Sequence, residues 1–386
     1  MKFDRVLDAF DSPPTKQIRG TELAKPTAGT IVAASGAAGF LVSHEENDAV
    51  TVINRVQKAG GDVYWLKSPI TAGGKTWPAG TYLISGTGAS DVATKSAADL
   101  GVSFVGVPSR PADAVKIPAK RVALYDQYGG SMPSGWTRLE FENFEIPYTV
   151  IYPKDIDAGN LKSKYDVIVL PSGAQIRGAG GGGFGGRGGG RGGDAAIPQE
   201  YQHMVGQLTP EKSVPALKQF MNDGGVVVTV GTATSLGYDL GLPISNYLLV
   251  RAPGKEDRPL TGEEYYIPGS ILQVTMDNTQ PVTAGMPEKV DVFFNNSPVF
   301  RLEPDAAAKG VKPLAWFDTE TPLRSGWAWG QNYLQGGTTM LQADIGKGKL
   351  YMFGPEITFR GQPHGTFKLL FNGIYAPTNL APSVVP

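Results

Sequence analysis

The stretch of sequence that decides the fold lies close to the end of the 386-residue chain. It reads Gly348-Lys349-Leu350-Tyr351-Met352-Phe353-Gly354-Pro355-Glu356 and continues with Gln362-Pro363-His364-Gly365-Thr366-Phe367-Lys368-Leu369-Leu370-Phe371. The first part is a short apolar run typical of a buried strand, and the apolar residues of the second part recur at helical spacing. The stretch therefore predicts a strand that runs into a closing helix.

Upstream of this unit, apolar runs alternate with helical patterns. Strands are predicted at Val122–Tyr125, Tyr148–Ile151 and Tyr165–Gly173, and the run Val226–Gly231 is apolar on both faces. Such runs, separated by helices, are typical of a parallel sheet that is covered on both sides. The sequence thus predicts an α/β fold with a doubly wound, mostly parallel sheet. Beyond residue 241, shorter strands and a hairpin that ends at Phe353 predict a mixed-sheet extension.

The length of the chain favours more than one domain. Residues 1–27 are polar and contain Pro13 and Pro14, which predicts an extended lead-in. Residues 28–118 read as a smaller α/β domain, and residues 119–378 as the main one. A linker is predicted at 108–120, where proline, alanine and lysine are frequent.

Composition excludes several classes of function. The chain has a formal net charge of -1, 41% hydrophobic residues and no cysteine. There is no bulk attraction to nucleic acid or to an anionic membrane, and neither disulfides nor thiol nucleophiles can form. The first ten residues carry acids where a signal peptide needs an apolar core, and no segment is long and apolar enough to span a membrane.

The three histidines do not form a metal-binding pattern. His44, His203 and His364 are far apart in the sequence, and zinc catalysis usually needs three clustered protein ligands. The motif His-x-x-Glu is approached only at His44, where the fourth residue is Asn47. No metal site and no cofactor are therefore predicted in this chain.

At the closing unit the chain resembles domains of the class I glutamine amidotransferase type, in which a strand runs into His-Pro-Glu. Gly354 occupies the histidine position of that pattern. The cysteine expected after the strand 226–231 is also missing, and the best match places Thr232 there, or Ala233 after a shift of one residue. The resemblance thus implies the fold without its catalytic cysteine and histidine, with Glu356 remaining.

Hydroxyl chemistry is an alternative at the same edge of the sheet. Ser172, in Pro171-Ser172-Gly173, could combine with His364 and Glu356 as a substitute triad, and Thr232 could act as a nucleophile if a base lay beside it. The competing interpretation is structural: Ser172 forms a tight turn, and His364 stands at the beginning of the last helix. We favour the structural interpretation.

The loop from Tyr125 to Arg138 is the preferred binding segment. It leaves the first strand of the main sheet and enters a helix, where open α/β sheets bind ligands. Tyr125 and Trp136 offer a stacking surface, and Arg138 offers a fork for a carboxylate. The alternative is that these three side chains simply pack.

A glycine- and arginine-rich loop at 178–193 resembles disordered RNA-binding segments. Arg177, Arg187 and Arg191 supply only three charges, so their contribution to phosphate binding is small. A flexible surface loop is the favoured interpretation. Nucleic acid is thus an alternative partner and not the expected one.

Scattered segments also resemble the non-catalytic C-terminal region of large bacterial zinc carboxypeptidases of the carboxypeptidase A type. The matching segments are 121–125, 135–138, 165–171, 268–272, 296–300 and 360–372. The resemblance implies a secreted or periplasmic protein whose zinc peptidase domain lies in sequence outside this chain, because no residue here matches that domain's zinc ligands.

These observations predict a non-catalytic accessory or ligand-binding region. Its expected partners are an upstream peptidase domain and a small-molecule or peptide ligand. The residues proposed for ligand binding are Tyr125, Trp136, Arg138, Ser172, Thr232, Glu356 and His364. A hydrolase that uses Ser172 or Thr232, and an RNA-binding protein, are the alternatives.

Overall fold

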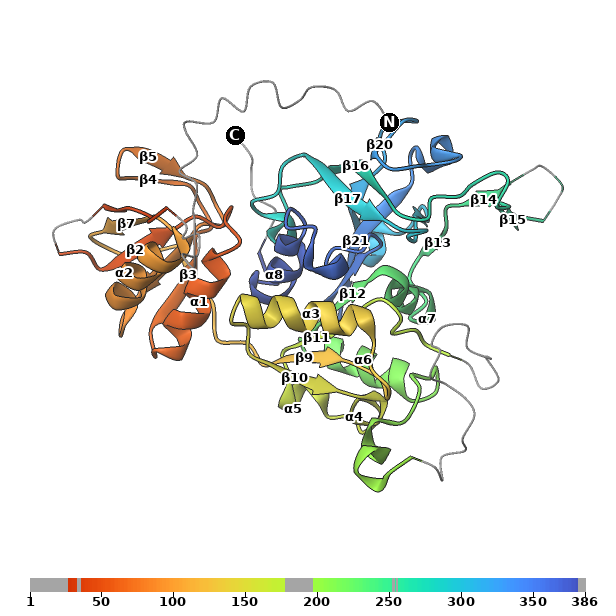
Figure 1. Ribbon diagram of the computed structural model, residues 1–386, viewed down its shortest axis with the longest axis horizontal. Coiled ribbons are helices and arrows are strands. Elements are labelled where there is room, and N and C mark those ends of the chain that lie inside the picture. The colour runs from red at the N-terminus through yellow and green to blue at the C-terminus, as the bar shows by residue number, and fades with distance from the viewer. Residues whose placement is uncertain (1–26, 33–35, 178–196, 252–253, 255, 381–386) are drawn as a thin grey trace, which may run out of the picture.

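The computed structural model describes residues 27–32, 36–177, 197–251, 254 and 256–380. Its strands form a six-stranded sheet near the N-terminus and a twelve-stranded sheet in the rest of the chain, together with two short hairpins. Figure 1 shows the two sheets as separate units, in red to orange and in yellow to blue. The fold class is therefore α/β, as predicted.

The smaller unit is a mixed sheet with the order β1-β7-β2-β6-β3-β8. Its elements are β1 (Ile31–Val32), β2 (Gly39–Val42), α1 (Ala49–Lys58), β3 (Asp62–Trp65), β6 (Tyr82–Ser85), α2 (Ala89–Leu100), β7 (Phe104–Val107) and β8 (Val115–Lys116). A separate hairpin joins β4 (Ile70–Ala72) to β5 (Lys75–Trp77). Because β8 pairs with β3, part of the segment predicted as a linker belongs to this sheet. The domain boundaries themselves stay a prediction.

Five parallel strands form one half of the large sheet, in the order β10-β9-β11-β12-β22. The elements of this half are β9 (Val122–Tyr125), α3 (Met132–Asn143), β10 (Tyr148–Ile151), α4 (Pro153–Asp157), α5 (Leu161–Lys164), β11 (Val167–Leu170), α6 (Ser213–Asn222), β12 (Val226–Val230), α7 (Leu236–Asp239), β22 (Gly348–Phe353) and α8 (Phe367–Tyr375). The chain passes from β9 to β10 on one side and then crosses back to β11, so the strand order reverses between β9 and β11.

Alternate residues of the parallel strands enter two different cores, one on each face of the sheet. Val122 and Leu124 pack in a cluster that includes residues of α3 and α8. Ala123 and Tyr125 pack in another cluster that includes residues of α4, α5 and α6. A strand buried on both faces needs apolar residues at every position, which explains the unalternated runs and confirms the doubly wound fold.

The other half of the large sheet is antiparallel, and it is the mixed extension that the sequence predicted. Its strands are β13 (Ile244–Asn246), β16 (Ser270–Met276), β17 (Lys289–Phe294), β18 (Phe300–Leu302), β19 (Val311–Trp316), β20 (Leu323–Ser325) and β21 (Thr338–Ile345). β21 pairs antiparallel with β22, which confirms the predicted hairpin and joins the two halves. A further hairpin joins β14 (Leu249–Val250) to β15 (Arg258–Pro259).

Helix α3 begins at Met132, and its cap is Ser131, whose side chain accepts a hydrogen bond from the backbone N–H of Ser134. A capping hydroxyl belongs just before the first turn, and Pro133 inside that turn is compatible with a helix start. Residues 1–26 of the predicted lead-in and the glycine-arginine segment 178–193 lie outside the described residues.

Within the described part of the chain, no helix is long and apolar enough to cross a membrane.

Candidate functional site

The carboxyl ends of the parallel strands meet at one edge of the large sheet. Asp126 follows β9, Ser172 follows β11 shortly after its end, Thr232 follows β12 and Glu356 follows β22. β9 and β11 are the strands between which the strand order reverses. Open α/β sheets bind ligands in the crevice at such a switch point.

Ser172, Thr232 and Glu356 form a hydrogen-bonded cluster at this edge. The Oγ of Ser172 lies 3.4 Å from Oγ1 of Thr232, and the backbone N–H of Gly173 donates to Oγ1 of Thr232 at 2.9 Å. Burial raises the pKa of the Glu356 carboxyl, while a side-chain hydrogen bond with Ser172 opposes that shift. Thr232 is exposed, and the other two side chains are partly buried. Three residues from three separate loops thus lie together; the sequence had suggested Ser172 beside Glu356, but it treated Thr232 separately.

The sharp turn after β12 is made by Gly231 and not by Thr232. Gly231 has a φ of +57°, a left-handed conformation, and Thr232 follows it in a short 3-10 turn (Gly231–Ser235). A Cβ on Gly231 would stand 2.4 Å from Oε1 of Glu356 and 2.5 Å from Oγ of Ser172. A nucleophile elbow needs a side chain on such a strained residue. Here the strained residue is Gly231, which has no side chain. The side chains of Ser172 and Glu356 fill the space that a side chain at this position would need.

A side chain at Gly354 would also clash with neighbouring atoms. Its Cβ would stand 2.4 Å from the carbonyl oxygen of Pro298 and 2.6 Å from that of Thr339. The Gly354 N–H donates to the same Thr339 oxygen at 2.9 Å, which fixes the close approach. A histidine at this position would require the backbone to move.

His364 makes its contacts with other groups. Its ring lies 4.9 Å from that of Phe367, and its carbonyl accepts a hydrogen bond from the Asn47 side chain of the smaller unit. The hydrogen-bond partners of Ser172 are instead Thr232 and Glu356. Of the three residues suggested as a substitute triad, Ser172 and Glu356 are hydrogen-bonded, whereas His364 makes its contacts with other groups.

The loop Tyr125–Arg138 presents less binding surface than the sequence suggested. Tyr125 is only 6% exposed, and burial raises its pKa to about 12. Trp136 is partly buried and packs edge-on against Phe359, with ring centroids 4.9 Å apart. Arg138 forms an ion pair with the buried Asp126. The packing alternative therefore describes these three residues, although their part in binding stays untested.

Sequence reasoning missed Glu140, one turn after Trp136 on α3. Its side chain is 2% exposed, its Oε2 has no hydrogen-bond partner among the described residues, and burial raises its pKa to about 7. It lies beneath Gly361, whose Cβ would stand 2.8 Å from Oε1 of Glu140. The available signal was a glutamate on the same helix face as Trp136, which is the face that packs against Phe359.

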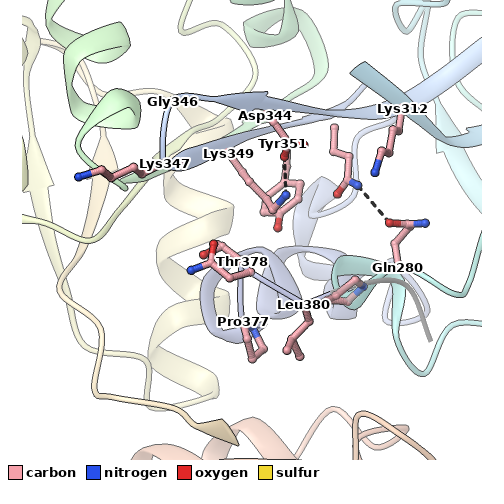
Figure 2. A pocket seen from close by; sticks show the side chains of 14 residues that line it. Gln280, Lys312, Asp344, Gly346, Lys347, Lys349, Tyr351, Pro377, Thr378 and Leu380 are labelled. Atoms are coloured by element: carbon pink, nitrogen blue, oxygen red, sulfur yellow. Dashed lines mark hydrogen bonds and ion pairs between the residues drawn. The ribbon is translucent and has the colours of Figure 1, made fainter. Parts of the chain in front are cut away.

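A pocket of about 500 Å³ lies at the opposite edge of the sheet, beside the turn between β21 and β22 (Figure 2). Two pairs of its polar side chains satisfy one another. Nζ of Lys349 is 2.5 Å from Oδ1 of Asp344, and Nε2 of Gln342 donates to Oε1 of Gln280 at 3.2 Å. We therefore place the candidate site at the carboxyl edge. Among the residues that the structure describes, no group of three or more histidine and acidic side chains is placed to hold a metal ion.

Comparison with known proteins gives weak structural similarity only. No protein-family model matches the chain, and no curated protein matches it. A ThuA-like protein from Bacteroides uniformis is 11% identical with a TM-score of 0.38, and the match covers 69% of this chain and 94% of that one. A glutamine amidotransferase from Thermotoga maritima is 12% identical with a TM-score of 0.35, covering 62% and 76%. Similarity at this level says nothing about activity, and the carboxypeptidase resemblance stays a prediction.

Proposed function

We propose that this chain is a non-catalytic, ligand-binding module built on an amidotransferase-like fold. The observation that carries the proposal is the pair Gly231 and Gly354. These residues occupy the elbow after β12 and the end of β22, and a Cβ on either one would stand within 2.4 Å of a neighbouring oxygen. A nucleophile and a base at these positions would need space that other atoms occupy.

The ligand would lie at the switch-point edge, against Ser172, Thr232 and Glu356. The two hydroxyls both donate and accept hydrogen bonds. The Glu356 carboxyl, whose pKa burial raises, accepts hydrogen bonds and donates one when it is protonated. Such a set suits a small molecule or a peptide end that carries carbonyl or hydroxyl oxygens.

The accessory role beside a zinc carboxypeptidase rests on the sequence resemblance. It is tested by reading the coding sequence upstream of Met1 and by measuring binding of this chain to any peptidase domain that is encoded there. An upstream reading frame without a peptidase would count against the accessory role, but it would leave the binding module intact.

Catalysis is tested directly on the purified protein. Turnover of glutamine, p-nitrophenyl acetate and a short peptide is measured with and without a metal chelator, and no turnover above the buffer rate is expected. The chelator separates the activity of a contaminating metallopeptidase from that of the chain itself.

A hydrolase is the second candidate, because the Ser172 hydroxyl is hydrogen-bonded to a carboxyl whose pKa is raised. A carboxylate of higher pKa is a stronger base for a serine. Esterase activity that survives the chelator, is lost in Ser172→Ala and persists in Ser235→Ala would establish this hydrolase and refute the non-catalytic proposal. Ser235 is a suitable control because it is a partly exposed serine after the neighbouring strand.

A further inference from the structure

Three aromatic side chains gather on the surface of the antiparallel half of the large sheet, beside β20. Trp327 is 57% exposed, Trp329 53% and Tyr266 44%. Tryptophan is highly buried on average in folded proteins. We call Tyr266, Trp327 and Trp329 the aromatic face.

The backbone geometry places the three rings on one side. Tyr266 and Trp329 form an antiparallel β-bridge, so their side chains point to the same side. Trp327 lies two residues before Trp329, and its ring contact with Tyr266 brings it to that side as well. The ring centroids of Tyr266 and Trp327 are 5.8 Å apart. The intervening residue, Ala328, packs instead against the core. In a strand on a protein surface, the residues that face solvent are usually polar and those that face the core are apolar. Here aromatic residues take the positions that face solvent.

The aromatic face is held in place before any ligand arrives. The backbone N–H of Trp327 donates to Oγ of Ser270 at 2.9 Å, and that hydroxyl donates to the Trp327 carbonyl at 2.6 Å. The indole N–H of Trp329 donates to the Glu263 carbonyl at 2.6 Å. Because the supporting groups are fixed, less conformational entropy is lost when a ligand stacks on the rings.

The two arginines that flank the aromatic face are paired. Arg258 forms a two-pronged ion pair with Glu264, two residues before Tyr266. Arg324, three residues before Trp327, pairs with Asp291 at 3.5 Å. With these arginines neutralised, little positive charge remains for the phosphates of a nucleic acid. The same pairs neutralise Glu264 and Asp291, so among the described residues a cationic ligand would find only the exposed carboxylate of Glu263 beside the rings. The surface suits an uncharged ligand.

The size of the aromatic face suits a small ligand better than a protein. Aromatic side chains have about 150–250 Å² of surface each, so three half-exposed rings offer on the order of 300 Å². A stable protein interface buries about 800 Å² on each partner. The remaining ligand class is neutral and has apolar faces for stacking and polar edges for hydrogen bonds.

We propose that the aromatic face binds a neutral carbohydrate chain, whose sugar rings stack their C–H faces on Trp327 and Trp329. This proposal uses no residue of the Ser172 cluster and does not depend on the proposed function.

The test uses the full chain and named polysaccharides. Retention is measured by affinity gel electrophoresis and pull-down on cellulose, chitin, xylan and starch, and the affinity for the matching hexasaccharide is measured by tryptophan fluorescence. We expect retention on at least one polymer and an affinity at least tenfold weaker in the Trp327→Ala, Trp329→Ala double variant. Trp327→Phe should keep most of the affinity, because it retains a stacking ring.

Tyr201→Ala is the matched control, since Tyr201 is 40% exposed and lies outside the aromatic face. It should bind like the parent chain, and the circular dichroism spectrum and Tm of each variant establish that it is folded. Retention on none of the four polymers would overturn the proposal, as would retention that the folded double variant keeps. Sedimentation and an RNA-binding assay complete the test: self-association or RNA binding that the double variant loses, without saccharide binding, would assign the aromatic face to another partner.

Discussion

At the scale of single residues, two glycines decide what the candidate site can do. Gly354 could be recognised from the sequence alone, because it stands where a related pattern has histidine. Gly231 could not, because it reads as the end of an apolar strand, and only the backbone shows its left-handed φ of +57°. The sequence therefore named Ser172, Thr232 and Glu356 among its candidates, but it preferred the loop 125–138 for binding and placed the turn after β12 one residue too late, at Thr232.

We predict that Gly354→Ala destabilises the fold. The new Cβ would stand 2.4 Å and 2.6 Å from two carbonyl oxygens, so the neighbouring strands would have to separate. Overpacking of this kind costs about 1–3 kcal/mol, and occasionally more. Urea unfolding monitored by tryptophan fluorescence measures the difference.

Gly135→Ala is the matched control for this substitution. Gly135 is exposed within α3, and a Cβ there meets no atom within 4 Å. Helix propensity then favours the variant by up to about 1 kcal/mol. If both variants lost the same stability, steric closure at Gly354 would not be the cause.

At the scale of elements, the regular strands were predictable and the small unit was less so. Val122–Tyr125 and Tyr148–Ile151 are strands with the expected bounds, because parallel strands buried on both faces are continuously apolar. The strand Gly39–Val42 was missed, since four residues are too few to show a clear alternation or a long apolar run. Strand β8 was read as linker because its two residues lie in a segment rich in proline and lysine.

Helix α8 carries a buried lysine that should make stability depend on pH. Lys368 is 6% exposed, its ammonium group donates to the carbonyl oxygen of His44 at 2.5 Å, and burial lowers its pKa to about 8 from 10.5. Between these values the unfolded chain binds more protons than the folded chain, so the free energy of unfolding should rise with pH. Buried tyrosines such as Tyr351, whose pKa burial raises, oppose this rise once unfolded tyrosines ionise at about pH 10.

The dependence is measured by urea unfolding at pH 7.0, 8.0, 9.0 and 9.5. Lys368→Met should remove most of the rise, because the group that titrates is gone. Lys312→Met, which alters an exposed lysine on β19, should keep it. An unchanged pH profile in Lys368→Met would show that another group is responsible.

At the scale of the whole molecule, the sequence predicted two units but not how closely they are joined. One hydrophobic cluster contains Val52 and Ile53 of α1 together with Phe144 and Phe371 of the large unit. The ring contact between Phe144 and Phe371, with centroids 4.7 Å apart, lies within this cluster. The apolar face of α1 was visible in the sequence, but a periodic pattern does not say which surface covers that face.

The buried contact between the two units contains a polar residue, Asn54. We predict that this contact makes the two units unfold together. Asn54 is 7% exposed; its Nδ2 donates to the Phe144 carbonyl at 3.0 Å, and its Oδ1 accepts from the Tyr375 hydroxyl at 2.6 Å. Asn54→Ala leaves both partners buried and unpaired, at a cost of about 1–3 kcal/mol for each. The parent should show one transition both in thermal unfolding measured by calorimetry and in urea unfolding followed by tryptophan fluorescence. Both midpoints should be much lower in the variant.

Asn47→Ala is the control for Asn54→Ala. It shows whether the loss of stability comes from the buried contacts between the two units or from the removal of any asparagine of the small unit. Asn47 also reaches from one unit to the other, to the His364 carbonyl at 2.8 Å, but it is only partly buried, and water can replace the lost bond. Its midpoint should therefore change little. Two separated transitions in the parent chain would mean that each unit is stable without the other. The buried contacts of Asn54 would then be an interface between independent domains, and Asn54→Ala would loosen that interface without lowering either midpoint.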